Sequence, residues 1–339
     1  MKIVKNQDLD KSKLKVGWIL SGSRNTAGAR IQGWNVHDEF IKNGINSEII
    51  SSKHFNYDLQ FTKEEINNIL NRRYDIIIFQ KIQTGENFFY FIQEAHKKRI
   101  KLVFIGIDDL NVEFAIKCDV IIVVSKYLKR LIPKRYQKKA FLVFDSYEHP
   151  RDMIKKPSNN HKLRMVFVSN NVFSKFPQID YLPQDVSLTI IGPSEERVKK
   201  YTPDKKMFTE TPYKFKYIVW SLENVHKEIL KCDVGVIPYR DKDLMKDYVR
   251  RKSNNRLVLF MSLGIPTIAS PTPEYKRLIK QGINGFIANN PKEWIKYLEF
   301  LRDNPEKRKQ IGEKARLATL DKYSPEAQAK LYLEIIQKA

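Results

Sequence analysis

The stretch KLVFIGIDDLNVEFAIKCDVIIVVS at residues 101–125 holds two apolar runs joined by a short polar and helical segment. Both runs, KLVFIG at 101–106 and DVIIVVS at 119–125, are continuous, which is typical of strands buried on both faces. The pattern of the segment between them predicts a helix over 110–117. The stretch therefore predicts a strand–helix–strand unit with parallel strands.

Runs of the same kind recur along the whole chain. They lie at 14–20, 74–80 and 140–144 in the first half, and at 163–169, 187–192, 217–220, 233–238, 266–270 and 285–288 in the second. This alternation predicts an α/β protein with two Rossmann-like, doubly wound parallel sheets.

A polar segment, YEHPRDMIKKPSNNHK at 147–162, separates the two sets of strands. It contains two prolines and no periodicity, as a linker would. We therefore expect an N-terminal domain over 1–150 and a C-terminal domain over 151–320. A helical tail over 321–339 carries an apolar stripe that needs a surface, and we expect it to pack back across the N-terminal domain.

The chain of 339 residues is strongly basic, with 61 Lys and Arg against 39 Asp and Glu and a formal charge of +22. This charge predicts an anionic partner, such as a nucleic acid, an acidic membrane or a phosphorylated small molecule. No apolar run approaches the ~20 residues that cross a bilayer, and the first residues lack a signal-peptide core. A cytoplasmic protein is expected.

Metal chemistry has little support in the sequence. CxxC, HxH and HExxH spacings are absent, so no metal and no other cofactor are expected. Cys118 and Cys232 occupy matching KCDV contexts before apolar runs. They are interpreted as small buried residues rather than as a disulfide.

The stretch KSNNRLVLFMSLGIP at 252–266 predicts a short amphipathic helix that Ser253 or Asn254 caps and that Gly264 and Pro266 end. Cations and amides surround its start in place of the acids that would complement the helix dipole. This arrangement indicates an anion site. The alternative is a solvated cap with incidental surface charge.

Residues 233–290 resemble the nucleotide-sugar-binding domain of GT-B glycosyltransferases, especially bacterial enzymes that build surface polysaccharides. The resemblance rests on DVGVIPY, KSNNRLVLFMSLGIPTIASPTPEYKRLIKQGINGFIA and NPKEWIKYLEFLRDNPEKRKQIGEKAR, and the layout of the first half agrees. It implies two Rossmann-like domains that face a central cleft. A nucleotide sugar would bind the C-terminal domain, a glycan or lipid-linked acceptor mainly the N-terminal one, and transfer would need no metal.

The resemblance also implies the donor-binding residues. Many members hold the diphosphate with an Arg and a Lys after the first C-terminal strand, and these positions are Asn170 and Lys175 here. The expected donor residues are Asn170, Asn171, Lys175, Arg251, Lys252, Ser253, Asn254, Asn255, Arg256 and Glu274. The family's usual pair of glutamates falls at Arg251 and Leu259, so this motif is missing.

The acceptor side is expected in the N-terminal domain, where residues follow the predicted strands. Candidates are Gly22, Ser23, Arg24 and Arg30 in SGSRNTAGAR, together with Gln80 and Lys81. Asp108 and Asp109 follow another strand, and an inverting transfer needs a base for the acceptor hydroxyl. Asp109 is the first candidate for this base; the alternative is an N-cap of the helix at 110–117.

Two basic segments, HKKRIK at 96–101 and KYLKRLIPKRYQKK at 126–139, remain outside the expected site. Tyr127, Leu128, Leu131, Ile132 and Tyr136 interleave the second, which suits an interfacial helix on anionic lipid. A solvated face is the alternative, and no nucleic-acid-binding module is present. We therefore expect a glycosyltransferase at the cytoplasmic membrane face. The rivals are a GT-B-fold binding protein without catalysis and a nucleic-acid-binding protein.

Overall fold

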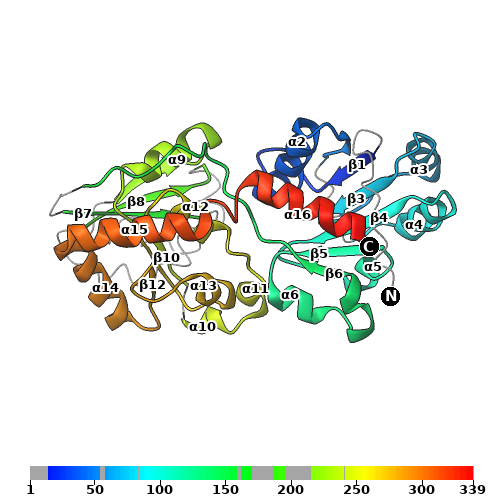
Figure 1. The fold of residues 1–339 in the computed structure, drawn as a ribbon. Helices are drawn as coiled ribbons and strands as arrows, with labels where there is room; N and C mark the ends of the chain where they lie inside the picture. The colour runs from blue at the N-terminus through cyan, green and yellow to red at the C-terminus, as the bar shows by residue number, and fades with distance from the viewer. Residues whose placement is uncertain are drawn as a thin grey trace, which may run out of the picture. The chain divides into compact units, whose positions relative to one another are not determined.

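The computed structural model describes residues 14–53, 58–82, 84–158, 162–169, 186–194, 215–239 and 241–338. The chain divides into two compact units (Figure 1). Unit 1 comprises residues 1–145 and 325–339, and unit 2 comprises residues 146–324.

Unit 1 is built on a six-stranded sheet in the order β2-β1-β3-β4-β5-β6, and all of its pairings are parallel. Its strands are β1 Lys15–Leu20, β2 Asn46–Ser51, β3 Ile76–Gln80, β4 Lys101–Gly106, β5 Val120–Val123 and β6 Ala140–Leu142. The strand order reverses between β1 and β3. Ligands of open α/β sheets bind beyond the carboxyl ends of the strands at such a reversal.

Helices connect these strands and cover the sheet. They are α1 Ala27–Ala29, the π-helical η2 Arg30–Trp34, α2 Asn35–Lys42, α3 Lys63–Leu70, α4 Phe88–Lys97, α5 Val112–Ala115, α6 Lys126–Leu131, the 3-10 helix η3 Lys134–Lys139 and α16 Pro325–Lys338.

Unit 2 repeats the architecture with a second parallel sheet in the order β12-β11-β10-β7-β8-β9. Its strands are β7 Leu163–Val168, β8 Val186–Gly192, β9 Phe215–Val219, β10 Val234–Ile237, β11 Thr267–Ala269 and β12 Phe286–Ile287. Its helices are α9 Leu222–Leu230, α10 Asp241–Leu244, α11 Asp247–Arg250, α12 Asn255–Ser262, α13 Pro273–Leu278, α14 Pro291–Asp303 and α15 Pro305–Thr319. Here the order reverses between β7 and β10. The α/β class and the two doubly wound parallel sheets are thus confirmed.

The last helix of the chain, α16, lies in unit 1 beside α2 (Figure 1). Its stripe of Ala329, Tyr332, Leu333, Ile335 and Ile336 belongs to the apolar core of unit 1. The Tyr332 hydroxyl donates a hydrogen bond to Gln32, and the Gln32 amide donates to Asp145 at 2.5 Å. The tail therefore has the covering surface that its apolar stripe requires.

The segment expected as a linker packs mostly onto unit 2. Tyr147 and His149 are buried, and the Lys155 ammonium donates to the Leu230 carbonyl at 3.0 Å. The first of these residues lie beside the boundary between the two units, which falls after residue 145.

No helix in the described part of the chain is long and apolar enough to span a membrane.

Candidate functional site

The start of α12 is the centre of the candidate site in unit 2. Asn254 occupies the N-cap position but makes no capping hydrogen bond through its side chain, and the first turn holds no acid. Gly264, at φ 76°, ends the helix, and Ile265 N donates back to the Phe260 carbonyl at 3.0 Å. The predicted helix start and stop are confirmed. The partial positive charge at its N-terminus has no acidic residue to balance it within the helix.

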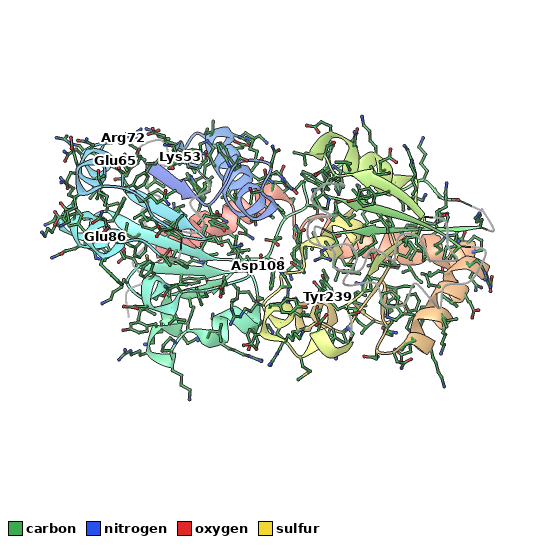
Figure 2. All side chains as sticks on the ribbon, turned by 180° about the vertical axis from the view of Figure 1, so that it is seen from behind. Lys53, Glu65, Arg72, Glu86, Asp108 and Tyr239 are labelled. Atoms are coloured by element: carbon green, nitrogen blue, oxygen red, sulfur yellow. The ribbon has the colours of Figure 1, made fainter. Side chains whose placement is uncertain are left out.

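Arg256, in the first turn, is anchored at the carboxyl edge of the sheet. Its Nη2 lies 3.4 Å from the hydroxyl of Tyr239, and its guanidinium carbon lies 5.8 Å from the centroid of that ring. Tyr239 lies two residues after the end of β10, is fully buried, and is labelled in Figure 2. Its backbone N–H donates to the Ser270 hydroxyl, which follows the neighbouring β11, at 2.8 Å. Two adjacent strand ends thus fix the arginine.

The phenol of Tyr275 lies beside that of Tyr239. Burial raises the pKa of Tyr275 well above its usual value, and the Tyr239 phenol raises it further, while the Arg256 charge acts in the opposite direction. The Tyr275 phenol therefore stays neutral beside the positively charged Arg256 guanidinium.

Asn254 and Glu274 lie in a buried cluster beneath the helix start. The Glu274 carboxylate is 1% exposed and accepts a hydrogen bond from Arg277 Nε at 2.9 Å. Asn254 is fully buried with its amide beside the Tyr323 hydroxyl, and burial raises the pKa of that phenol. Glu274 is therefore paired within α13 itself, one turn along the helix.

The remaining donor candidates fall into two groups. Arg251, Lys252, Ser253 and Asn255 are half-buried around the start of α12, so the structure brings them together with Arg256. Arg251 also lies 3.8 Å from Asp247, one turn back along the chain. Asn170, Asn171 and Lys175 lie outside the described residues.

In unit 1, the two arginines of the loop after β1 bond to the unit itself. Arg24 makes two hydrogen bonds to Asp38, at 2.6 and 2.8 Å, and lies 4.4 Å from the centroid of the Trp34 ring. The bond to Asp38 raises the pKa of Arg24. Arg30 is 3% exposed and donates to the Arg24 carbonyl at 2.7 Å. Both side chains hold the loop in shape.

The two small residues of that loop have local roles as well. The Gly22 carbonyl accepts a hydrogen bond from the Trp34 indole at 3.2 Å. The Ser23 hydroxyl accepts one from Asn25 N at 3.3 Å. These contacts describe a compact turn that leads into α1.

Polar residues also gather at the ends of β3 and β4. Gln80 is buried, and its Oε1 accepts hydrogen bonds from Ser21 N and Ser21 Oγ at 3.1 and 2.9 Å. Lys81 Nζ lies 3.6 Å from the Asp108 carboxylate. Ser21 was not among the sequence candidates, although it directly follows β1 as Gln80 closes β3.

Asp109 is exposed, and its carboxylate accepts a hydrogen bond from Leu110 N at 3.0 Å. The helix in this region begins only at Val112, and the Asn111 side chain caps it by accepting from Phe114 N at 3.3 Å. The interpretation of Asp109 as the N-cap is therefore wrong. Asn111, which is about as good a cap as Asp by residue type, stands two residues further along and makes the capping bond.

The basic segment 126–139 presents charge but no apolar face. Leu128 and Ile132 are buried, and Leu131 and Tyr136 pack against the core of unit 1. Lys126, Arg130, Lys134, Arg135 and Lys138 are exposed. Tyr127 is half-buried, so four of the five apolar residues expected on an interfacial helix serve the core. Docking of the segment on anionic lipid stays a prediction.

Other basic side chains of the two segments are engaged. Lys139 donates to the carbonyls of Ile116 and Cys118, and burial lowers its pKa. In the segment 96–101, Lys97 pairs with Glu94 at 2.6 Å, and Lys101 donates to the Ile336 carbonyl at 3.0 Å.

A cavity of about 230 Å³ lies at the opposite, amino edge of the unit 2 sheet. Its lining includes Asp233, which is 1% exposed and pairs with Arg164 at 2.8 Å and with Lys155 at 3.2 Å. The cavity lies beside ion pairs that fasten the segment after residue 146 to the sheet, away from α12's start.

Cys118 and Cys232 are both buried and free, so the interpretation of these residues as small buried side chains is confirmed. Burial raises the pKa of each thiol. Among the described residues, no three or more His, Cys, Asp or Glu side chains are grouped so that they could hold a metal ion.

Several solved structures share this architecture over nearly its whole length. HepE from Anabaena, solved with UDP-glucose, aligns with a TM-score of 0.70 and 12% identity over 96% of this chain and 100% of that chain. A glycosyltransferase from Rickettsia africae aligns with a TM-score of 0.70 and 12% identity, covering 96% of this chain and 98% of that chain. The lipopolysaccharide outer core galactosyltransferase WaaB aligns with a TM-score of 0.62 and 15% identity, covering 96% of this chain and 99% of that chain.

Sequence comparison adds a family match in the second half of the chain. Residues 223–334 match the family described as glycosyl transferase-like. No curated protein matches the chain in sequence. The fold is that of the GT-B glycosyltransferases, and the resemblance seen in the sequence is confirmed.

Proposed function

We propose that this protein is a glycosyltransferase that moves a sugar from a nucleotide-activated donor to a glycan or lipid-linked acceptor in cell-surface polysaccharide biosynthesis. One observation carries the proposal: the first turn of α12 holds no acid, the Asn254 side chain makes no capping hydrogen bond, and Arg251, Lys252 and Arg256 surround this N-terminus. Asn255 N donates to Ser253 Oγ at 3.4 Å, a long bond that a phosphate oxygen could replace. Such a terminus suits a diphosphate.

The same groups would assist the reaction. The diphosphate of the donor gains negative charge as its bond to the sugar breaks. N–H groups and cations already fixed at that position stabilise this charge. Each charge-assisted hydrogen bond contributes about 1.5–3 kcal/mol. Arg256, held by Tyr239, needs little reorganisation for this task. The family's glutamate pair is replaced by Arg251 and Leu259, so the cations would carry a larger share of donor binding.

The similar proteins support the donor and the pathway. HepE was solved with UDP-glucose, and WaaB is a lipopolysaccharide outer core galactosyltransferase. We infer that this chain likewise takes a nucleotide sugar and acts on a surface glycan or its lipid-linked precursor, without a metal ion.

Calorimetry tests the donor site. The wild-type protein is titrated with UDP-glucose, UDP-N-acetylglucosamine and GDP-mannose to find a donor that binds. Lys252→Ala and Asn255→Ala should each weaken that binding by about tenfold, because each loses one hydrogen-bonding group in a partly dry site.

Lys292→Ala is the matched control, because Lys292 is exposed on α14 of the same unit and loses the same charge. Its affinity should equal that of the wild type. Unchanged affinity in both site variants would remove the start of α12 from the donor site.

A binding protein without catalysis is the second candidate, and the missing glutamate pair at Arg251 and Leu259 favours it. Release of UDP or GDP from the donor that binds separates the two functions. A purified protein that binds the donor and releases no nucleotide over hours would be a binding protein.

We further propose that the protein docks peripherally on the inner face of the cell membrane through the basic segments 96–101 and 126–139. Because Leu128, Leu131, Ile132 and Tyr136 belong to or pack against the core, this docking would be mainly electrostatic.

A further inference from the structure

The carboxyl ends of β1 and β3 in unit 1 mark the reversal of strand order, where α/β sheets bind ligands. Ser21 follows β1, Gln80 ends β3, and Ser21 N and Oγ both donate to Gln80 Oε1. Gln80 is fully buried, and its Nε2 has no hydrogen-bond partner within the described part of the chain. A buried amide donor without a hydrogen-bond partner destabilises the fold, and a bound ligand that accepts its hydrogen bond would remove this cost.

The position of this amide can be fixed from Gly28 in α1. A methyl group placed on Gly28 would lie 3.9 Å from Gln80 Nε2 and 3.7 Å from the Ile107 side chain. The unpartnered nitrogen therefore lies between α1 and the residue that precedes Asp108.

Asp108 stands at the centre of a tight turn. Asp109 N donates to the Ile107 carbonyl at 2.6 Å, and Asp108 has φ 61°, which together describe the rare and strained form of the γ-turn. Lys81, directly after Gln80, also has a positive φ of 59°. Strain of this kind in residues other than glycine gathers at functional sites.

Two other residues with positive φ have an ordinary explanation. Arg73 and Arg99 lie just after α3 and α4, where left-handed residues commonly end a helix. Lys81 and Asp108 instead follow neighbouring strands, and their side chains meet at 3.6 Å. The Asp108 side chain remains 39% exposed at its end of the sheet (Figure 2).

We propose that Asp108 and Gln80 bind the reacting end of the acceptor, with Asp108 as the general base in place of Asp109. This inference rests on the proposed function. The Asp108 carboxylate accepts the proton of the acceptor hydroxyl, and the Gln80 amide donates to a neighbouring oxygen of the acceptor. Lys81 positions Asp108. Its charge offsets that of the carboxylate, so the site suits a neutral sugar or polyol.

The step balances as a displacement. The acceptor oxygen loses its proton to Asp108 and forms the new bond to the anomeric carbon of the donor sugar. The bond from that carbon to the diphosphate breaks, and its electron pair leaves with the nucleoside diphosphate. Because this is a single displacement at the anomeric carbon, it inverts the configuration of that carbon.

The test compares two adjacent carboxylates. Nucleotide release from the donor that binds best is measured without and with glycerol as a polyol acceptor. Asp108→Asn should lower kcat by about a hundredfold or more with donor affinity unchanged, because general base catalysis typically contributes that much. Asn also tolerates a positive φ, so the turn is retained. Asp109→Asn, the matched control, should stay within about threefold of the wild type.

The pH profile adds a readout that a structural role would not change. The kcat of the wild type should fall on the acidic side as the carboxylate is protonated, and Asp108→Asn should lack this limb. Equal kcat for Asp108→Asn and wild type, or an equal loss in Asp109→Asn, would overturn the assignment.

Gln80→Glu tests the amide separately, because it keeps the oxygen that Ser21 bonds and replaces only the nitrogen. We expect at least a tenfold loss of transfer to glycerol, and Gln80→Met should show the same loss without a buried charge. Normal transfer by Gln80→Met would overturn the role of the amide.

The failures are distinguishable. If no nucleotide sugar binds the wild type, the proposed function fails. If a donor binds but no nucleotide is released, the proposed transferase function fails as well and a binding protein remains. If nucleotide is released but the rate is insensitive to Asp108, the present inference fails while the proposed function stands.

Discussion

The residues at the ends of the strands were the part of the site that could be predicted from the sequence. Gln80, Lys81 and Asp108 follow continuous apolar runs, and this position alone places them at the ligand-binding edge of a parallel sheet. The pairing of charged residues could not be predicted. Arg24 and Glu274 were expected to contact ligands, and the structure adds that they pair with Asp38 and Arg277 in their own units.

These pairs could not be predicted because the identity of a charged residue does not show whether its side chain contacts a substrate or a neighbouring residue. The sequence analysis missed Tyr239 for a related reason, because a tyrosine that follows a buried strand is usually a residue of the apolar core. Its role emerges only through its contact with Arg256.

His149 gives a prediction at this scale. Its Nδ1 lies 2.8 Å from the Pro150 carbonyl and its Nε2 lies 2.7 Å from the Ser262 hydroxyl. Burial lowers the pKa of His149 from 6.5 to about 4, and the nearby charges of His226 and Arg316 act in the same direction. The folded protein therefore keeps this ring neutral.

Because the unfolded chain takes up the proton more readily, the stabilisation is complete above pH 6.5 and is lost as the pH falls toward 4. The free energy of unfolding should drop by about 2 kcal/mol between pH 7 and pH 5 from this group. Urea unfolding at both pH values measures it, and His149→Gln should lack that part of the drop. An identical drop in the variant would contradict the account.

At the scale of the element, the strands with continuous apolar runs were all predictable, and β2 was missed. Its sequence, NSEIIS, forms the outer strand of the sheet, and its residues are half-buried or exposed. An edge strand pairs along only one side, so it needs no unbroken apolar run and leaves a weak signal.

The contact between α12 and α15 gives a second prediction. Gly312 of α15 lies so close to Gly264 that a Cβ atom would overlap the Gly264 carbonyl oxygen. Backbone cannot move aside as a flexible side chain can. Gly312→Ala should therefore destabilise the protein by about 2–4 kcal/mol, despite the better helix propensity of alanine.

Lys314→Ala, at an exposed position of the same helix, is the control and should change stability by less than about 0.5 kcal/mol. Thermal unfolding of the wild type, Gly312→Ala and Lys314→Ala measures these differences in stability. If Gly312→Ala melts with the wild type, the two helices do not meet at this glycine.

At the scale of the whole molecule, the sequence predicted two sheets because buried parallel strands have an unmistakable pattern. The apolar stripe of the C-terminal helix predicts only that the helix packs on a surface, and does not predict its register on that surface. Its register depends on the chain from Tyr332 through Gln32 to Asp145, and no local pattern indicates hydrogen bonds between residues so far apart.

The charge of the molecule supplies a prediction at this scale. Arg130, Lys134, Arg135 and Lys138 are exposed in unit 1, and each cation near an anionic surface contributes about 1 kcal/mol. Replacing all four with Gln should release the protein from phosphatidylglycerol vesicles in a sedimentation assay at low salt. Raised salt should do the same to the wild type.

The control replaces Lys292, Lys307, Lys309 and Lys314 of unit 2 with Gln, which removes equal charge from exposed positions. This variant should sediment like the wild type. Equal loss in both variants would mean that net charge, and not the segment 126–139, attracts the protein to the membrane.

The central claim is that the start of α12 binds the diphosphate of a nucleotide-sugar donor. A crystal structure with the nucleoside diphosphate of the donor that binds tests it most directly. The account predicts phosphate oxygens within hydrogen-bond distance of the backbone N–H groups of Asn255 and Arg256, with Lys252 beside them. A nucleotide bound with its phosphates away from that helix start would contradict it.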